Sequence, residues 1–238
     1  GNSSVKAAVW DGGWGEAVRW PSDAASEAVW AERLRRLGAG IDGAGLASVV
    51  PDLTPVLAEA VRIAFGTEAV AISADLPLPF RMAYRTPHTL GADRLAAAVA
   101  AHALAGGRAV VALDAGSAIT TEAVSVEPAY LGGAILPGPD LLRRALARDT
   151  RQLPEVAWTL PASVIGTLTT EAIQAGLVAL VLDGVAGLLD RTMEAVGGEP
   201  LVVATGGWGP WLAERLPIID RVEPHLVLEG IRLLTEAV

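Results

Sequence analysis

The first part of the chain alternates between short apolar runs and longer amphipathic stretches. Runs of this length are typical of strands, and amphipathic stretches bounded by capping residues are typical of helices. The Asp-Gly-Gly turn at residues 11–13 predicts a hairpin between the first two strands. The strands are predicted at residues 5–10, 16–20, 46–50 and 69–73, and the helices at 22–37 and 54–65. The predicted order is β-β-α-β-α-β.

A proline-rich segment, residues 75–89, interrupts this series. Each proline fixes φ and removes an amide donor, so we predict an extended surface segment of the kind that often carries function. An alanine-rich helix is predicted to follow at residues 91–105 and to end at Gly106 and Gly107.

A second series of strands and helices fills the rest of the chain. The strands are predicted at residues 108–114, 118–124, 130–136 and 201–205, and the helices at 139–148, at 169–196, directly after 207 and at 225–237. Because both halves show a similar strand-then-helix series, we expect two related α/β lobes with a cleft between them. The lobes are predicted to be 1–106 and 107–238, with the last helix able to pack back on the first lobe.

Composition narrows the class of protein. Hydrophobic residues make up 52% of the chain and charged residues 19%, which is typical of a compact domain that folds on its own. The net charge of −9 argues against a nucleic acid or an anionic membrane as partner, and the lack of cysteine excludes disulfides, thiolate zinc ligands and thiol nucleophiles. No basic segment precedes an apolar one, and no apolar run near 18 residues is uninterrupted, so we expect a cytoplasmic protein without a membrane span.

Two Gly- and Ser-containing segments could bind phosphate. The first runs from Gly1 to Lys6, where a tight turn could present backbone amides and the lysine to phosphate, although an ordinary hairpin would look the same. In the second, an apolar strand runs into Asp114, Gly116 and Ser117. The carboxylate could hold a cation while the turn admits a phosphate chain, or the aspartate could simply accept its own backbone amides.

Two further segments could bind a nucleotide and a substrate. Residues 205–207, Thr-Gly-Gly, end a buried strand and would let a base or a phosphate approach the backbone, or they form a plain strand-to-helix turn. Asp93 and Arg94 lie in the first turn of a predicted helix. The helix dipole favours an ionised carboxylate there, and the arginine could pair with a substrate carboxylate; the alternative is a solvated capping pair.

The histidines and two tryptophans are predicted to serve packing. His88, His102 and His225 share no metal-site spacing and are interpreted as structural or solvated. Trp208 and Trp211 flank the helix after residue 207, where they could lie near an adenine, although packing in the core or on the surface is the favoured interpretation.

Taken in order, the motifs of the chain resemble those of type III pantothenate kinases. The similarity continues to the segment 223–232, Glu-Pro-His-Leu-Val-Leu-Glu-Gly-Ile-Arg. The matching motifs are Gly-Asn-Ser-x-x-Lys at 1–6, Ser-Val-Val-Pro at 48–51, Gly-x-Asp-Arg at 91–94, Asp-x-Gly-Ser-Ala at 114–118, Gly-Gly-Ala-Ile-x-Pro-Gly at 132–138 and Thr-Gly-Gly at 205–207.

The resemblance implies a fold, a reaction and an assembly. The fold is that of the actin-like ATPase, or acetate and sugar kinase, superfamily, with two ribonuclease H-like lobes. The reaction is the ATP-dependent phosphorylation of pantothenate to 4'-phosphopantothenate, the first step of coenzyme A biosynthesis, with Mg²⁺ and a monovalent cation, K⁺ or NH₄⁺. The assembly is a homodimer whose interface borders the pantothenate pocket.

The resemblance also assigns roles to individual residues. Asp93 falls on the general base, and Asp114 on the ligand of the monovalent cation. The pantothenate contacts are Tyr84, Gly91, Ala92, Arg94 and, from the partner subunit, Thr169. The nucleotide contacts are Gly1, Asn2, Ser3 and Lys6 in the first turn, Gly116 and Ser117 in the second, and Thr205, Gly206 and Gly207 in the third.

The sequence departs from the family pattern at two places. The family motif begins Asp-x-Gly-Asn-Thr, and the sequence begins at the glycine of that motif, so we expect the aspartate that helps hold the magnesium nucleotide to lie upstream of Gly1. A natural protein without it would bind ligands without turnover, as a regulatory or binding protein. Thr167 and Leu168 stand where the family commonly has Lys-Asn. A kinase of the same superfamily acting on another hydroxyl substrate, such as a sugar, is the remaining alternative.

Overall fold

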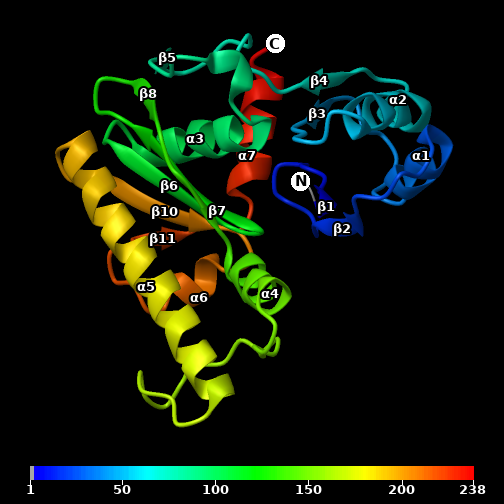
Figure 1. Cartoon of the computed structure of the whole chain (residues 1–238). Coiled ribbons are helices and arrows are strands. Elements are labelled where there is room, and N and C mark those ends of the chain that lie inside the picture. Colours follow the sequence, from blue (N-terminus) through cyan, green and yellow to red (C-terminus); the bar gives the residue numbers. More distant parts are fainter. Residues whose placement is uncertain (1–2) are drawn as a thin grey trace. The chain divides into compact units, whose positions relative to one another are not determined.

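The computed structural model describes residues 3–238, and these residues divide into two compact units. The first unit holds the chain up to Gly106, together with Pro128–Tyr130 and His225–Val238. The second unit holds Gly107–Glu127 and Leu131–Pro224. Both are mixtures of helices and strands (Figure 1).

The N-terminal part of the first unit follows the order β-β-α-β-α-β, as predicted from the sequence. The elements are β1 (Ser4–Ala7), β2 (Val18–Pro21), α1 (Glu27–Arg35), β3 (Ala44–Leu46), α2 (Leu53–Phe65) and β4 (Ala69–Ala71). Strands β1 and β2 form an antiparallel hairpin, and β3 and β4 form a parallel pair. Trp30 is fully buried among apolar residues of α1 and α2, so the two helices enclose a small core of their own.

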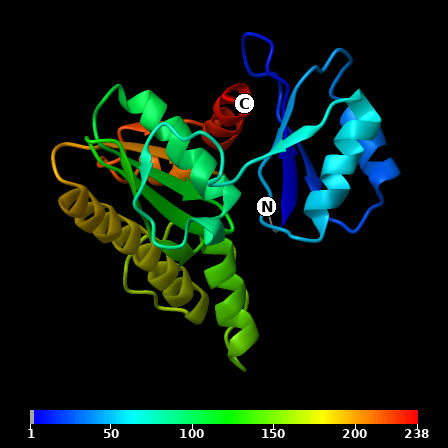
Figure 2. The ribbon, with the colours of Figure 1, turned by 90° about the horizontal axis from the view of Figure 1, so that it is seen from above.

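The rest of the first unit contains a short strand, a 3₁₀ turn and two helices. These elements are β5 (Arg81–Met82), the 3₁₀ turn Pro87–Thr89, α3 (Ala92–Ala105) and α7 (Leu226–Glu236). Helices α3 and α7 lie side by side (Figures 1 and 2). Their backbones touch, because a Cβ added to Gly230 would collide with the carbonyl oxygen of Ala96. The alanine-rich sequence of α3 permits this close packing, since small side chains let helix axes approach.

The second unit is built on a sheet. Its elements are β6 (Val110–Ala115), β7 (Ala118–Val124), β9 (Ile135–Pro137), α4 (Pro139–Asp149), α5 (Thr169–Val196), β10 (Leu201–Thr205), α6 (Gly209–Ala213) and β11 (Arg221–Val222). The strand order is β11-β10-β6-β7, with β9 also paired to β7. Strand β10 runs parallel to β6 and β11, whereas β6 and β7 are antiparallel. Strand β8 (Ala129–Gly132) begins in the first unit, where it pairs with β5, and ends in the second.

Helix α5 covers one face of this sheet (Figure 1). Val181, Val185 and Leu189 are buried against apolar side chains of β6, β7 and β10. By length and composition alone α5 could span a membrane, since an 18-residue window has a mean hydropathy of 2.0, although Asp183 interrupts its apolar run. Of that window, 39% is buried inside the protein, so one face of this apolar helix belongs to the core.

Several boundaries differ from the prediction for local reasons. Helix α1 begins at Glu27 rather than residue 22; Asp23, in the segment before it, pairs bidentately with Arg33 at 2.7 and 2.8 Å. Strand β3 ends at Leu46. The strand predicted at 130–136 is two strands, β8 and β9, separated where the backbone amide of Ala134 donates a hydrogen bond to the hydroxyl of Thr121.

Candidate functional site

The carboxyl ends of β6 and β10 meet at one edge of the sheet in the second unit. Asp114 and Thr205 are register partners across this parallel pair, and Thr120 of β7 lies opposite Asp114. Register partners point to the same face of a sheet, so the three side chains share one face. Ligands of parallel α/β sheets bind outside the carboxyl ends of the strands, so this edge is the expected position of a ligand-binding site.

The loop after β10 lies directly on the turn between β6 and β7. Gly206 has φ +83°, and a Cβ added there would collide with the carbonyl oxygen of Ala115 and lie 2.5 Å from Oδ1 of Asp114. The backbone amide of Trp208 donates a hydrogen bond of 2.9 Å to the same carbonyl oxygen. Only glycine fits this position, both for its backbone conformation and for the space.

A third turn packs against the same place. The backbone amide of Gly138, between β9 and α4, donates a hydrogen bond of 3.1 Å to the carbonyl oxygen of Ser117. A Cβ added to Gly138 would lie 2.7 Å from that oxygen and would collide with the carbonyl oxygen of Gly116. The turns at residues 116–117, 138 and 205–206 therefore form one cluster, in which glycines let the backbones approach one another closely.

Three tryptophans pack next to this cluster of turns. The indole Nε1 of Trp208 donates a hydrogen bond of 3.2 Å to Oδ2 of Asp140 in the first turn of α4. The rings of Trp158, Trp208 and Trp211 meet edge to face, with centroids 5.1 to 5.7 Å apart, and they pack against the core of the unit. The packing interpretation of Trp208 and Trp211 agrees with this arrangement.

In the first unit, Asp93 and Arg94 lie in the first turn of α3, after the N-cap Gly91. Both side chains are half-buried, and Oδ1 of Asp93 accepts a hydrogen bond of 2.8 Å from the backbone amide of Arg94. A Cβ added to Gly91 would lie 2.7 Å from that carboxylate oxygen and 3.6 Å from a methyl carbon of Val49. The Ser-Val-Val-Pro motif and the Gly-x-Asp-Arg motif are therefore neighbours, while Ala92 is buried in the helix.

Aromatic contacts hold the segment that carries Tyr84. Its half-buried ring meets the buried ring of Tyr130 at 5.9 Å, and Tyr130 stacks on Phe80 at 6.0 Å. The segment predicted to be an extended loop is therefore anchored at its middle. Tyr84 and Asp93 belong to the same unit.

The first phosphate motif lies on the β1–β2 hairpin. Ser3 directly precedes β1, and Lys6 lies within it, opposite Arg19 of β2. Gly1 and Asn2 lie outside the residues that the structure describes.

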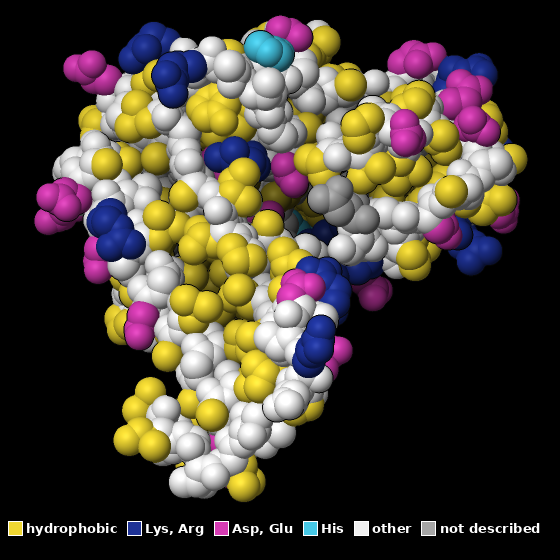
Figure 3. Space-filling model, viewed as in Figure 1, with side chains coloured by type: hydrophobic (Ala, Val, Ile, Leu, Met, Phe, Trp, Pro, Cys, Tyr) yellow, Lys and Arg dark blue, Asp and Glu magenta, His cyan; other side chains and the backbone are white. Residues whose placement is uncertain are grey.

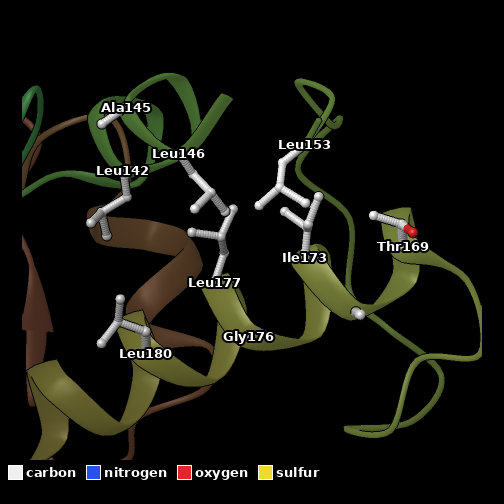
Figure 4. A pocket seen from close by; sticks show the side chains of 10 residues that line it. Leu142, Ala145, Leu146, Leu153, Thr169, Ile173, Gly176, Leu177 and Leu180 are labelled. Carbon is white, nitrogen blue, oxygen red and sulfur yellow. The ribbon is translucent and has the colours of Figure 1, made fainter. Parts of the chain in front are cut away.

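Thr169 begins α5 in the second unit and is exposed. It lies at the end of an apolar groove of about 680 Å³ between α4 and α5, where Leu146, Leu153, Ile173 and Leu177 point toward one another (Figure 4). The backbone amide and the hydroxyl of Thr167 both donate hydrogen bonds of 2.9 Å to Glu171. These bonds lower the pKa of Glu171 and hold the chain as it enters the helix.

The histidines lie apart from one another. His102 packs edge-on against Phe80, His225 edge-on against Trp14, and His88 lies in the 3₁₀ turn. Within residues 3–238, no three His, Asp or Glu side chains come together in a group that could hold a metal ion. Asp114 with its neighbouring backbone carbonyls nevertheless offers the oxygen donors that hard cations prefer.

Comparison with known proteins identifies the family. The sequence model described as type III pantothenate kinase matches residues 1–191. The chain belongs to the type III pantothenate kinase family. The type III pantothenate kinase of Moorella thermoacetica is 38% identical over 196 residues, which cover 82% of this chain and 77% of that protein. That of Acidiphilium cryptum is 36% identical over 244 residues, which cover 98% of this chain and 91% of that protein.

Solved structures agree with the fold expected for a type III pantothenate kinase. A protein described as a conserved putative Baf family transcriptional activator from Campylobacter jejuni superposes with a TM-score of 0.62 at 18% identity, covering 99% of this chain and 94% of the other. A putative N-acetylglucosamine kinase from Porphyromonas gingivalis superposes with a TM-score of 0.50 at 14% identity, covering 97% and 94%. The predicted fold class, an α/β fold like that of acetate and sugar kinases, is confirmed.

Two features of this type III pantothenate kinase were missed in the sequence. Glu122 is 1% exposed, although it is charged, and its only signal is a carboxylate inside the apolar strand β7. The second feature joins Trp10 and Trp14 to Glu229 and Arg232. These residues lie far apart in the sequence, so no local pattern could predict their contact.

Proposed function

We propose that this protein transfers the γ-phosphoryl group of ATP to the primary hydroxyl of pantothenate and so forms 4'-phosphopantothenate, the first step of coenzyme A biosynthesis. The observation that carries the proposal is the close packing of Gly206 on Asp114 and Ala115, at the carboxyl ends of β6 and β10. This packing leaves backbone and a carboxylate, rather than bulky side chains, where a phosphate chain would bind. We also propose a cytoplasmic location, which suits such a metabolic kinase.

The nucleotide side of the reaction is proposed to use three turns. Ser3 and Lys6, with Gly1 and Asn2, would hold one end of the phosphate chain, and the lysine would offset its negative charge. Gly116 and Ser117 would hold it from the second turn. The strand-end residues Thr205, Gly206 and Gly207 would form the third turn, on the nucleotide side.

Two cations are proposed to complete the nucleotide site. When bound, Mg²⁺ neutralises charge on the β- and γ-phosphoryl oxygens, and a monovalent cation, K⁺ or NH₄⁺, adds to that field. Asp114 is the proposed ligand of the monovalent cation, since its carboxylate lies beside the glycine turn. The protein's own contribution is to hold the triphosphate in one orientation.

Asp93 is proposed to orient the substrate hydroxyl and to accept its proton. An aspartate is far too weak a base to remove an alcohol proton in advance. In a loose phosphoryl-transfer transition state the nucleophile keeps most of its proton until late, so the carboxylate needs only to align the hydroxyl and take the proton at the end. Asp93 lies in the first turn of α3, where the positive end of the helix dipole favours negative charge.

The pantothenate side is proposed to lie next to Asp93. Arg94 can bind the substrate carboxylate with two parallel hydrogen bonds, and Tyr84 offers a ring and a hydroxyl to the amide part. Gly91 and Ala92 place no bulky side chain next to Asp93. This set suits an amide with a carboxylate better than a neutral sugar.

We further propose that the protein is a homodimer in which Thr169 of one subunit borders the pantothenate pocket of the other. The support is the apolar face around the groove of α4 and α5, which Figure 3 shows as a gathering of hydrophobic side chains. The exposed large apolar residues on these helices and on the segment before α5 are Leu141, Leu160, Val164, Ile165, Leu168 and Leu180. A face of this kind is typical of a surface covered by another subunit.

The test follows ADP release by the purified protein with ATP and Mg²⁺, with and without pantothenate and with and without K⁺. We expect release that requires pantothenate and rises with K⁺. Ligand binding without ADP release at any K⁺ concentration would support a regulatory protein instead. Faster release with a member of a sugar panel than with pantothenate would assign the other kinase activity.

A further inference from the structure

The connection between β1 and β2 is held by a cluster of aromatic and charged side chains. Trp10 and Trp14 form an isolated β-bridge across this connection, and their rings meet at 5.3 Å. The indole of Trp14 donates a hydrogen bond of 3.1 Å to Oε2 of Glu229, on α7. The guanidinium of Arg232, one turn further along α7, lies 4.5 Å from the ring centre of Trp10.

Glu229 and Arg232 also bind each other. The guanidinium donates two hydrogen bonds to the carboxylate, of 3.0 and 2.5 Å, and a third of 2.6 Å to Glu236. The pKa of Glu229 is lowered chiefly by the hydrogen bond from Arg232, so the pair is ionised. We call the four residues Trp10, Trp14, Glu229 and Arg232 the hairpin clamp.

The hairpin clamp is more than a surface ion pair. The side chains of Arg232 and Glu229 are 19% and 24% exposed, whereas those of the comparable pair Arg62 and Glu59 on α2 are 53% and 40% exposed. Ion pairs with large solvent exposure contribute little to stability. The indole donor and the ring under the guanidinium give the clamp fixed directions that the α2 pair lacks.

Helix α7 connects the clamp to two other parts of the first unit. Its Gly230, between the two charged residues of the clamp, touches the backbone of α3 at Ala96. On another side, a Cβ added to Gly45 of β3 would lie 2.5 Å from a methyl carbon of Ile231. The same helix therefore contacts the hairpin that carries Ser3 and Lys6 and the helix that carries Asp93.

We propose that the hairpin clamp is a positioning device for phosphoryl transfer: it fixes the phosphate-binding hairpin to α7, and through α7 to the helix of Asp93. The proposal rests on the proposed function, because it assigns the hairpin to the triphosphate. The clamp residues touch neither substrate. They act by keeping Lys6 and Asp93 in a fixed position relative to each other. A weakened clamp lets the hairpin move and misplaces the triphosphate, while the pantothenate contacts stay unchanged.

Two conservative substitutions weaken the contacts within the hairpin clamp. Arg232→Lys keeps the charge but loses the two parallel hydrogen bonds and the flat stacking on Trp10. Trp14→Phe keeps an aromatic ring but removes the indole donor to Glu229. The matched control is Arg62→Lys, the same substitution in the i,i+3 pair of α2.

The experiment measures the dissociation constant of ATP by calorimetry, the KM of each substrate, and backbone amide exchange over residues 4–21. In both clamp variants we expect faster exchange in the hairpin and a dissociation constant and KM for ATP raised roughly 2- to 30-fold, the range for changes transmitted through a packed network. The KM for pantothenate should stay within about twofold of the wild type. Arg62→Lys should change none of these values.

Each contrary result has a separate meaning. Unchanged hairpin exchange, unchanged ATP affinity, or equal rises in both KM values would overturn the clamp as a positioning device. A wild-type protein that binds ATP but does not phosphorylate pantothenate would overturn the proposed function, while ATP affinity and exchange in the variants would still decide the clamp. If Arg232→Lys fails to fold, Trp14→Phe carries the same comparison.

Discussion

Asp114 and Thr205 lie side by side across the parallel strands β6 and β10, although β7, β8, β9, α4 and α5 come between them in the sequence. Gly206, the residue after Thr205, packs closely against the turn that follows Asp114. The edge of the sheet is therefore a composite of two segments.

The substitution Gly206→Ala tests that contact. Alanine at φ +83° costs about 1–2 kcal/mol for its backbone conformation, and its Cβ would also collide with Ala115. We expect a lower melting temperature, measured by calorimetry, and weaker ATP binding. Gly207→Ala is the control for stability, because no atom lies within 4 Å of a Cβ at that position. Equal melting temperatures for the two variants would contradict the packing described for Gly206.

The substitution Asp93→Asn tests the proton acceptor. We expect turnover to fall by roughly 10²- to 10⁴-fold, the loss typical of a general acid–base group, with ATP binding nearly intact. The amide oxygen of asparagine can still accept the hydrogen bond from the backbone amide of Arg94, so α3 should keep its first turn. Steady-state rates of ADP release and calorimetric ATP titration measure the two effects. A rate equal to that of the wild type would remove Asp93 from the catalytic role.

Elements with strong local signals were predicted to the residue or nearly so. The bounds of α5, β7 and β10 match the prediction, because apolar periodicity and glycines mark their ends. Strands β5 and β11 were missed, since each has two residues and exists only through pairing with a distant strand. The single strand predicted at 130–136 was wrong for a similar reason: its interruption depends on a contact with β7.

The candidate site shows the same limit. Motifs and resemblance indicated Asp114, Thr205 and Asp93, because small residues and carboxylates at strand and helix ends stand out in a sequence. They did not indicate that Gly138 packs on the turn of Gly116, since that contact is a property of the folded sheet. The hairpin clamp was missed for the same reason: the sequence alone does not show whether a tryptophan and a distant arginine are in contact.

The substitution Leu180→Glu tests the proposed dimer. Leu180 lines the groove of α4 and α5 and is 56% exposed, so a charge there should leave the fold intact and disfavour association. We expect a dimer in the wild type and a monomer in the variant by sedimentation or light scattering. Val126→Glu is the matched control, because Val126 is 57% exposed and does not line the groove. A monomeric wild type, or a dimer in Leu180→Glu, would contradict this interface.

The last prediction concerns His102, whose Nδ1 is buried without a hydrogen-bond partner. Burial lowers the pKa of His102 from its ordinary value of 6.5, because the charged ring loses hydration in the helix packing. The folded protein therefore binds this proton less readily than the unfolded chain does. Linkage then requires the free energy of unfolding to fall as the pH drops below about 6.5, and to be unaffected by this group at higher pH.

Comparison with His102→Gln isolates this contribution. All other ionisable groups are the same in both proteins, so their effects cancel in the difference between the two curves of melting temperature against pH. We expect the wild type to lose more stability than the variant between pH 7.5 and pH 5.5, values that span the ordinary histidine pKa of about 6.5. The difference should be flat above that range. Parallel curves throughout would mean that the proton binds His102 equally well in the folded and unfolded states, and would contradict the partial burial of this side chain on α3.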